Sequence, residues 1–354
     1  MTGQPTHPIE RTVQMAGGST FTLSLPREWG DDHGLSKGDT LYLYPNSDRL
    51  IVAPSTIDAE SNATRIDVAD VAEEGIVQRI RGAYTAGLDR IVVASESGLD
   101  DDLLRRVTDA VESFIGMEVQ TVADDEVVIQ DHLDPDAVSI PQSIEQMRQH
   151  AVEMQRDAVT AVRTDDDTLA RIVRERDTHV DRLFAFVSRC LHRGLEDVNE
   201  LGRLNVTRKD AFHYYKVARE LERVADRAER IADAAVEQSA PPDEDLGERF
   251  ETLVSTATDV VTLALAGNTG RAIEAHRAVT EQLDELDAQL AARGDPDAYR
   301  YGRDLVESAR RTSAHGLNIV NMTVEASVAN KLRPDEQGQY GRSQPTARLG
   351  RGTN

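Results

Sequence analysis

The fold of this 354-residue chain is decided by two stretches, Glu175-Arg-Asp-Thr-His-Val-Asp-Arg-Leu183 and Leu221-Glu-Arg-Val-Ala-Asp-Arg-Ala-Glu-Arg-Ile231. Their apolar residues recur with the period of an amphipathic helix. Each stretch also carries two carboxylates four positions apart, and residues with that spacing lie on one helix face. The two stretches therefore predict two helices that each present a pair of acids, and the four acids are Asp177, Asp181, Glu222 and Asp226.

The helical period extends beyond these stretches, from Pro141 to residue 331. It predicts six helices, at about 143–163, 166–193, 208–237, 244–266, 270–292 and 297–331. The connections between them are short, so neighbouring helices are expected to run antiparallel. The tail at 333–354 is rich in Gly, Gln, Ser and Pro, which predicts disorder.

The chain before the helices divides into two smaller regions. Residues 9–54 show the period-two alternation of short strands, as in Thr20-Phe-Thr-Leu-Ser-Leu-Pro26. So short a region cannot bury a good core alone, and β-domains of this size usually dimerise. Residues 60–135 alternate helix and strand and predict a small α/β unit, with helices at 68–84 and 99–115 and strands at 89–94, 117–122 and 127–130.

The composition excludes several classes of protein. The chain has 63 acidic and 40 basic residues, a net charge of −23, which weighs against non-specific coating of DNA. Acids spread along the whole chain are typical of proteins that work at high salt, so we expect a halophilic source. The single cysteine, Cys190, excludes an internal disulfide framework and suits a reducing cytoplasm.

The sequence also lacks membrane and export signals. No apolar run approaches the roughly 18 residues of a membrane span, and the longest, from Val260 to Ala266, is bounded by Asp259 and Gly267. The first residues contain no apolar core of a secretory signal. We therefore expect a cytoplasmic protein without membrane insertion.

The two acid pairs are spaced so that they can converge. If their helices form an antiparallel hairpin that turns near Leu201-Gly202, Asp181 and Glu222 lie at one height. Asp177 and Asp226 then match one turn further from the hairpin turn. Four carboxylates in one patch repel each other unless a cation lies among them. An all-oxygen ligand set suits hard cations such as Mg²⁺, Mn²⁺ or ferric iron.

Two other interpretations of these acids stay open. Nearly a fifth of the residues are acidic, so pairs with this spacing also arise as ordinary solvent-facing side chains. Arg223 and Arg227 stand next to the second pair and can bridge its acids as salt bridges. Either alternative removes the need for a metal ion.

The two stretches resemble the E/DxxxD-bearing helices of PhoU, the family of phosphate-uptake regulators. The resemblance implies two tandem three-helix bundles, here at 141–240 and 243–331. It also implies that the motif residues bind metal ions on the bundle surface. Carried over to this chain, the metal ligands are Asp177, Asp181, Glu222 and Asp226.

The second bundle departs from the pattern of the family. Alignment with the first bundle places Thr280, Arg310 and Ala314 at three of the four acidic positions, and only Asp284 remains acidic. An antiparallel hairpin that turns near Asp297 brings Asp284 and Arg310 to one level. We therefore expect a salt bridge between these two residues and one metal cluster per chain.

The N-terminal region looks like the swapped-hairpin domain of the AbrB/SpoVT family. The similarity rests on Gly18-Ser-Thr-Phe-Thr-Leu-Ser-Leu-Pro-Arg-Glu-Trp29 and Gly34-Leu-Ser-Lys-Gly-Asp39. It implies that two chains interlock into a homodimeric β-barrel that often binds DNA. The region holds four bases against six acids, so DNA has to be bound by few contacts. Arg11 and Arg27 are the candidates, and a plain surface role stays open for each.

Together these features predict a regulator and not an enzyme. The leading hypothesis is a dimeric regulator of phosphate uptake that binds promoter DNA, with the ATPase of a phosphate ABC transporter or another signalling protein as partner. A second hypothesis is a DNA-independent adaptor whose β-domain only dimerises. A third, a metal-dependent hydrolase, ranks last because the sequence offers no general base or oxyanion donor beside the acids.

Overall fold

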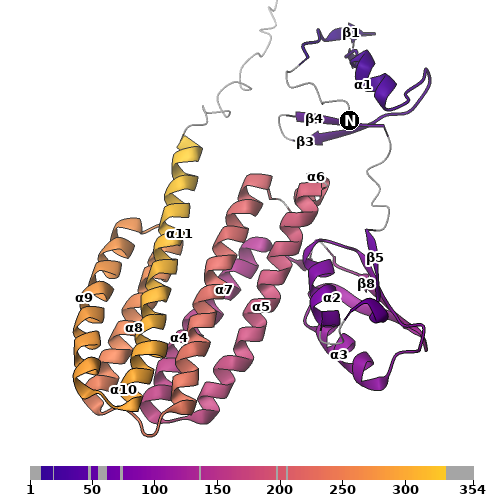
Figure 1. The fold of residues 1–354 in the computed structure, drawn as a ribbon. Coiled ribbons are helices and arrows are strands. Elements are labelled where there is room, and N and C mark those ends of the chain that lie inside the picture. The colour runs from indigo at the N-terminus through magenta and orange to yellow at the C-terminus, as the bar shows by residue number, and fades with distance from the viewer. Residues whose placement is uncertain are drawn as a thin grey trace, which may run out of the picture.

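The structure is a computed structural model, and it describes residues 9–18, 20–46, 49–54, 62–71, 75–134, 137–196, 198–204 and 206–331. The tail predicted at 333–354 lies outside these residues. The described chain is mainly helical, and two short hairpins and a four-stranded α/β unit precede the helices (Figure 1). None of the described helices combines the length and the apolarity needed to cross a membrane.

Long helices form where the apolar period predicts them. They are α4 (Ile140–Thr164), α5 (Asp167–Glu196), α7 (Arg208–Glu237), α8 (Glu244–Leu265), α9 (Thr269–Arg293) and α11 (Glu307–Lys331). A short helix, α6 (Val198–Arg203), follows α5. The last predicted helix is interrupted, because α10 (Pro296–Arg300) and a π-helical turn at Tyr301–Val306 precede α11. Counted together with α11, they leave both ends of each of the six helices predicted from 143 to 331 within three residues of the observed ones.

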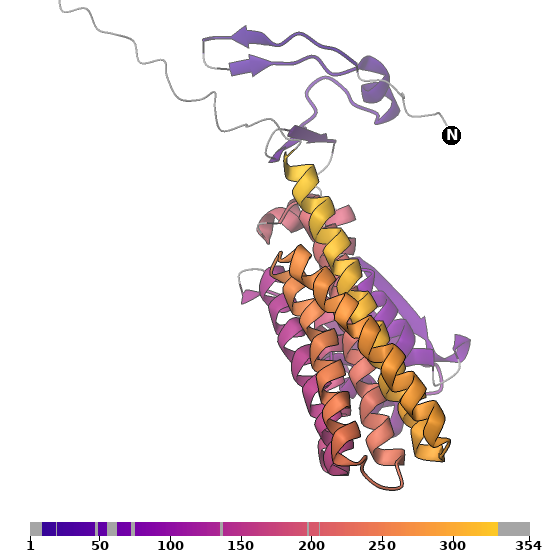
Figure 2. The ribbon, with the colours of Figure 1, turned by 90° about the vertical axis from the view of Figure 1, so that its left-hand side faces the viewer.

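The six long helices form two groups that share one core. Helices α4, α5 and α7 pack together, and α8, α9 and α11 pack beside them (Figure 2). Polar contacts cross between the groups as well. Gln155 of α4 is fully buried and donates to the backbone carbonyl of Val224 (2.7 Å) and to Thr312 of α11 (3.1 Å). The two bundles are therefore joined through polar and apolar contacts together.

The α/β unit has a mixed sheet. Its elements are β5 (Ala63–Asp67), α2 (Gly75–Thr85), β6 (Arg90–Ala94), α3 (Asp101–Glu112), β7 (Met117–Val122) and β8 (Glu126–Asp131). The strand order is β5-β6-β8-β7, with β5 parallel to β6 and the other pairs antiparallel. Strand β5 was not predicted, because it lies at an edge and only Ile66 of its five residues is buried. The helix predicted at 68–84 accordingly begins later, at Gly75.

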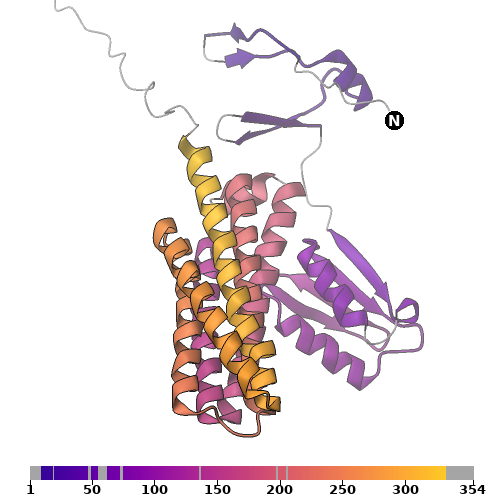
Figure 3. The same cartoon turned by 60° about the vertical axis from the view of Figure 1, so that its left-hand side comes forward.

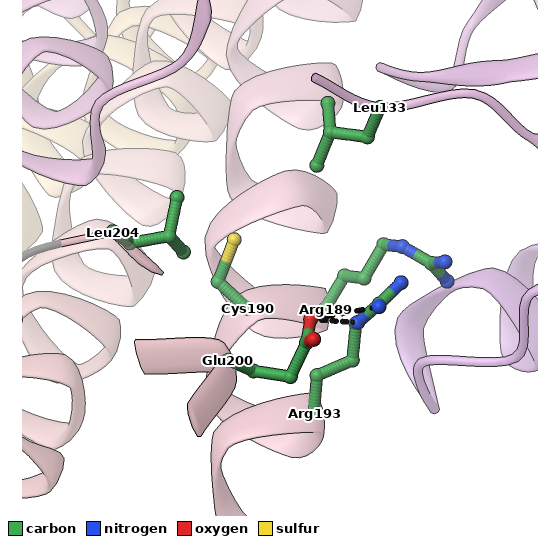
Figure 4. Close-up of a pocket in the computed structure, with 6 residues that line it drawn as sticks. All are labelled: Leu133, Arg189, Cys190, Arg193, Glu200 and Leu204. Atoms are coloured by element: carbon green, nitrogen blue, oxygen red, sulfur yellow. Dashed lines mark hydrogen bonds and ion pairs between the residues drawn. The ribbon is translucent and has the colours of Figure 1, made fainter. Parts of the chain in front are cut away.

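Two arginines of α5 fix the α/β unit to the first bundle, beside which it lies in Figure 3. Arg189 is 1% exposed and donates to the carbonyl oxygens of Tyr84 (2.8 Å) and Leu88 (2.9 Å). Arg189 and Arg193 both pair with Asp131 of β8, at 2.6 and 2.7 Å. The two guanidinium groups lie beside a small hollow lined by Leu133, Cys190, Glu200 and Leu204 (Figure 4).

The N-terminal segment has no buried core of its own. It contains β1 (Gln14–Ala16), β2 (Thr20–Thr22), α1 (Arg27–Asp32), β3 (Tyr42–Asn46) and β4 (Arg49–Ala53), and the strands form two separate antiparallel hairpins. No described side chain between residues 9 and 54 is buried. An isolated hairpin is marginally stable in water. Eight apolar side chains of the segment are more than a third exposed: Ile9, Val13, Met15, Phe21, Leu23, Tyr42, Leu43 and Leu50.

Candidate metal centre

The packing of α5 against α7 positions the predicted acids. Val180 and Leu183 of α5, and Leu221 and Val224 of α7, are buried in the shared core. Because the core residues recur at helical spacing, the acids between them lie at the rim of the α5–α7 contact. Each of the four predicted ligands is half-buried there.

The four acids act on one another as a single electrostatic cluster. Burial raises the pKa of Asp177 from 3.8 to about 7, and repulsion from Asp181, Glu229, Asp226 and Glu222 adds to the effect. Burial, followed by repulsion from Asp226 and Asp181, raises the pKa of Glu222 from 4.5 to about 7. The pKa of Asp226 is raised by burial as well, although the guanidinium of Arg227 opposes the shift. The structure thus brings the four predicted acids together.

A fifth acid, Glu229, belongs to the cluster and was missed in the sequence. Burial raises its pKa first, and repulsion from Asp233 and Asp226 adds to this. A local signal for it exists, because Glu229 stands three residues after Asp226 and seven after Glu222. That spacing places all three acids on the same face of α7.

The cluster contains an acceptor atom without a partner. The Oδ1 atom of Asp177 is buried and accepts no hydrogen bond. A buried polar atom without a partner costs free energy, and a cation at this position removes that cost. Carboxylate oxygens are ligands that hard cations prefer, so the residues fit such an ion. As the described side chains stand, no three His, Cys, Asp or Glu residues are grouped closely enough to hold a metal ion.

The neighbouring arginines of α7 do not bridge the four acids. Arg223 pairs with Glu220, at 3.2 Å, and not with Glu222. The Nε atom of Arg227 is buried without a partner, and within the described residues Arg227 forms no ion pair with the four acids. The alternative in which these two arginines neutralise the cluster through salt bridges is therefore wrong in this structure.

One acid of the cluster pairs with a residue from outside the bundle. The Nη1 atom of Arg81, in α2 of the α/β unit, lies 3.3 Å from Oδ2 of Asp181. The two residues are 100 positions apart in the sequence. No local pattern points to this contact, and it was not predicted.

The first bundle also matches a known family. Residues 144–235, which include all of α5 and the four predicted ligands, match the family model of the PhoU domain. Those residues are a PhoU domain. No curated protein matches the chain. The phosphate transport system regulatory protein PhoU from Streptococcus pneumoniae is similar in structure at 16% identity, with a TM-score of 0.43 over 54% of this chain and 94% of that chain. That likeness is too low to support an argument about this chain.

The bundle that follows the PhoU domain carries a different salt bridge from the one predicted. Arg310 of α11 pairs with Asp287 of α9, at 2.8 Å, and with Glu307, at 3.1 Å. Asp284 is exposed and is not a partner of Arg310. The predicted Asp284–Arg310 bridge is wrong because the residue of α9 that lies level with Arg310 is Asp287, three residues after Asp284.

Two further residues of the PhoU domain lie outside the cluster. Cys190 is buried in the core, and burial raises the pKa of its thiol to about 12. His179 is exposed, with its ring 5.8 Å from that of His150.

The two candidate DNA contacts lie outside the PhoU domain, and both are exposed. Arg11 precedes β1 and donates to the backbone carbonyl of Glu10, at 2.9 Å. Arg27 begins α1 and pairs with Asp31, at 3.5 Å, with its side chain 92% exposed. The resemblance of this segment to AbrB/SpoVT is not supported by a family model and stays a prediction.

Proposed function

We propose that this chain is a cytoplasmic regulator of phosphate uptake and phosphate homeostasis that works by binding and not by catalysis. The observation that carries the proposal is the PhoU domain at residues 144–235. Among the described residues, the four acids of α5 and α7 form no ion pairs with arginines of these two helices. This suits a domain that binds a cation as part of its regulatory function. The transporter's ATPase or another signalling protein is the partner that this function requires.

The metal ion of the proposal is Mg²⁺, Mn²⁺ or an iron ion. Asp177, Asp181, Glu222 and Asp226 would hold it, and the orphaned Oδ1 atom of Asp177 supports this choice. A bound ion supplies positive charge to a patch that otherwise repels anions. Glu229 adds a further carboxylate at the edge of the patch. The protein's own residues position these oxygens by holding α5 against α7.

The N-terminal segment is proposed to make the chain a homodimer. Its exposed apolar side chains and its lack of a buried core support a second copy as the surface that covers them. In the dimer, Arg11 and Arg27 would contact promoter DNA. The alternative is an adaptor that dimerises without DNA, and the six acids against four bases in this segment favour that outcome at low salt.

The first experiment measures phosphate uptake in cells that lack this chain, grown with high and low phosphate. We expect that uptake no longer follows the phosphate supply, and that the wild-type gene restores the response. An Asp177→Asn, Glu222→Gln variant should fail to restore it. Asp284→Asn, which removes an exposed acid of the second bundle, is the matched control and should restore it. A normal response in cells without the chain rejects the proposal.

The second experiment separates promoter binding from the adaptor role. DNA cross-linked to the chain is recovered from cells at high and low phosphate. We expect enrichment at promoters of phosphate-transport genes, retained by Arg79→Ala and lost in Arg11→Ala, Arg27→Ala. If no DNA is enriched while the chain remains dimeric, the adaptor is the function.

A further inference from the structure

Helix α2 of the α/β unit is held firmly against α5 of the PhoU domain. The buried guanidinium of Arg189 binds the carbonyl oxygens of Tyr84 and Leu88 at the end of α2. Ala185 of α5 is part of the buried core of the α/β unit. The turn after α2 approaches α5 so closely that a Cβ on Gly87 would lie 2.8 Å from Cγ of Arg193. The position of α2 relative to α5 is therefore fixed at one end.

That anchored end places Arg81 at the acid cluster. Arg81 lies one turn before Tyr84 on α2, and Asp181 lies two turns before Arg189 on α5. The guanidinium reaches the Asp181 carboxylate at 3.3 Å, with the two side chains 49% and 33% exposed. Of the four proposed ligands, all within the described residues, Asp181 alone has an ion-pair partner.

The contact between Arg81 and Asp181 affects the charge of the whole acid cluster. Asp177, Glu222 and Asp226 are half-buried and, among the described residues, form no ion pair. Arg81 thus supplies a positive charge to the cluster from a different structural unit. Arg81 contacts Oδ2 of Asp181, so a metal ion that binds through this oxygen competes with Arg81 for it.

We propose that Arg81 is a tethered counter-ion of the metal centre, which a bound metal ion displaces from Asp181. The inference rests on the proposed metal function of this cluster. Displacement removes the contact that Arg81 makes with α5, one turn before the end of α2 that Arg189 keeps in place. Metal occupancy is thereby linked to the α/β unit, and the linkage is reciprocal: whatever loosens α2 strengthens metal binding.

The test is a titration of the full chain with Mn²⁺, with the free ion measured by electron paramagnetic resonance at fixed pH and salt. The variants are Arg81→Ala, Asp181→Asn and the control Arg79→Ala, which removes an exposed arginine from the same helix. Arg81→Ala should bind Mn²⁺ about two- to five-fold more tightly than the wild type, the range that an exposed ion pair supports. Arg79→Ala should bind like the wild type, and Asp181→Asn should bind more weakly.

A second readout follows α2 directly. Hydrogen exchange of the amides of residues 75–85 should become faster in the wild type when Mn²⁺ is added. In Arg81→Ala the exchange should already be faster without metal, and Mn²⁺ should change it little. Equal exchange in the wild type with and without bound Mn²⁺ overturns the proposal.

The outcomes separate this inference from the metal function beneath it. If Asp181→Asn weakens Mn²⁺ binding while Arg81→Ala binds like the wild type, the metal centre stands and the counter-ion role of Arg81 is wrong. If Arg81→Ala and Arg79→Ala strengthen Mn²⁺ binding equally, the loss of any positive charge on α2 explains the change. The proposal is then also wrong. If no variant binds Mn²⁺, the metal centre fails and this inference fails with it.

Discussion

In the PhoU domain, helices α5 and α7 meet with acids on both sides, and among the described residues Asp177, Glu222 and Asp226 form no ion pair. In the second bundle, Arg310 of α11 stands at one aligned acidic position and pairs with Asp287 of α9. The side chains at the aligned positions therefore differ between the bundles. The second bundle has an arginine there that pairs with an acid of the facing helix, whereas three acids of the first bundle have no ion-pair partner among the described residues.

A second difference is where the arginines of each bundle lie. Arg189 of α5 is buried and joins the PhoU domain to the α/β unit, whereas Arg310 is 42% exposed and joins only α9 to α11. Buried charges are costly to leave unpaired, and exposed pairs contribute little. The comparison therefore predicts that substitutions of Arg189 and of Arg310 change the free energy of unfolding by very different amounts.

Arg189→Met is expected to have the largest effect. It removes one positive partner of Asp131 and the guanidinium that donates to the carbonyl oxygens of Tyr84 and Leu88. We expect the free energy of unfolding to fall by about 3–5 kcal/mol. Urea unfolding followed by circular dichroism measures the change, with Arg310→Met as the control. A loss below about 1 kcal/mol would mean that the α/β unit does not depend on this arginine.

Glu220→Gln should have the next largest effect, because it weakens a second polar contact between the two bundles. Glu220 is 5% exposed and accepts hydrogen bonds from His315 (2.8 Å) and Asn318 (2.9 Å) of α11. Burial pushes the pKa of Glu220 up, but these hydrogen bonds outweigh burial and lower it. We expect a loss of about 1.5–3 kcal/mol at pH 7, typical of hydrogen bonds to a charged group.

The pH dependence of this loss gives a check on its cause. Because the pKa of Glu220 is lowered in the fold, its contribution is present above its ordinary pKa of 4.5 and disappears as the pH falls through the lowered value. The wild type and Glu220→Gln should therefore converge in stability in strong acid. A difference that stays constant down to pH 3 would point to lost packing and not to the charge.

The sequence predicts the helices and the acid cluster because both depend on local spacing. The apolar period of α5 and α7 comes from residues three or four positions apart, and the i,i+4 acids use the same geometry. Glu229 follows the same rule and was missed only because the motif stops at Asp226. Only the position of the turn between α5 and α7 is then needed to predict which acids of the two helices lie at the same height.

The residues that connect the units could not be predicted in this way. Arg81 meets Asp181 across 100 positions, and Arg189 meets Tyr84 across 105. Such contacts depend on how one folded unit docks on another, which no local period encodes. The Asp284–Arg310 prediction was wrong for a related reason, since α10 and the π-helical turn at 301–306 separate α9 from α11 and shift the level at which they meet.

Asp177→Asn tests the acids of the first bundle that form no ion pair, with Asp284→Asn as its counterpart in the second. The pKa of Asp177 is raised to about 7, so its ionisation destabilises the fold as the pH rises from about 4 to 7. The three-unit shift corresponds to about 4 kcal/mol, and half-exposure to solvent reduces this to about 1–2 kcal/mol. The metal-free Asp177→Asn variant should be more stable than the wild type by that amount at pH 8 and equal to it below pH 4.

The same pair of variants also tests the cation. Addition of Mn²⁺ at pH 8 should raise the melting temperature of the wild type and of Asp284→Asn, and should leave that of Asp177→Asn nearly unchanged. Equal stabilisation of all three proteins by Mn²⁺ would show that the ion does not use the α5–α7 acids.

The smallest effect is expected for the Arg310–Asp287 pair, which joins α11 to α9 at the surface of the second bundle. Both side chains are more than a third exposed, at 42% and 49%, so solvent screens their attraction. A double-mutant cycle with Arg310→Gln and Asp287→Asn should give a coupling energy of about 0.2–1 kcal/mol, which declines with added salt. A coupling above about 2 kcal/mol would mean that this pair holds α9 to α11 as firmly as Arg189 holds the α/β unit. The contrast between a buried arginine that stabilises one contact and an exposed arginine that contributes little would then be wrong.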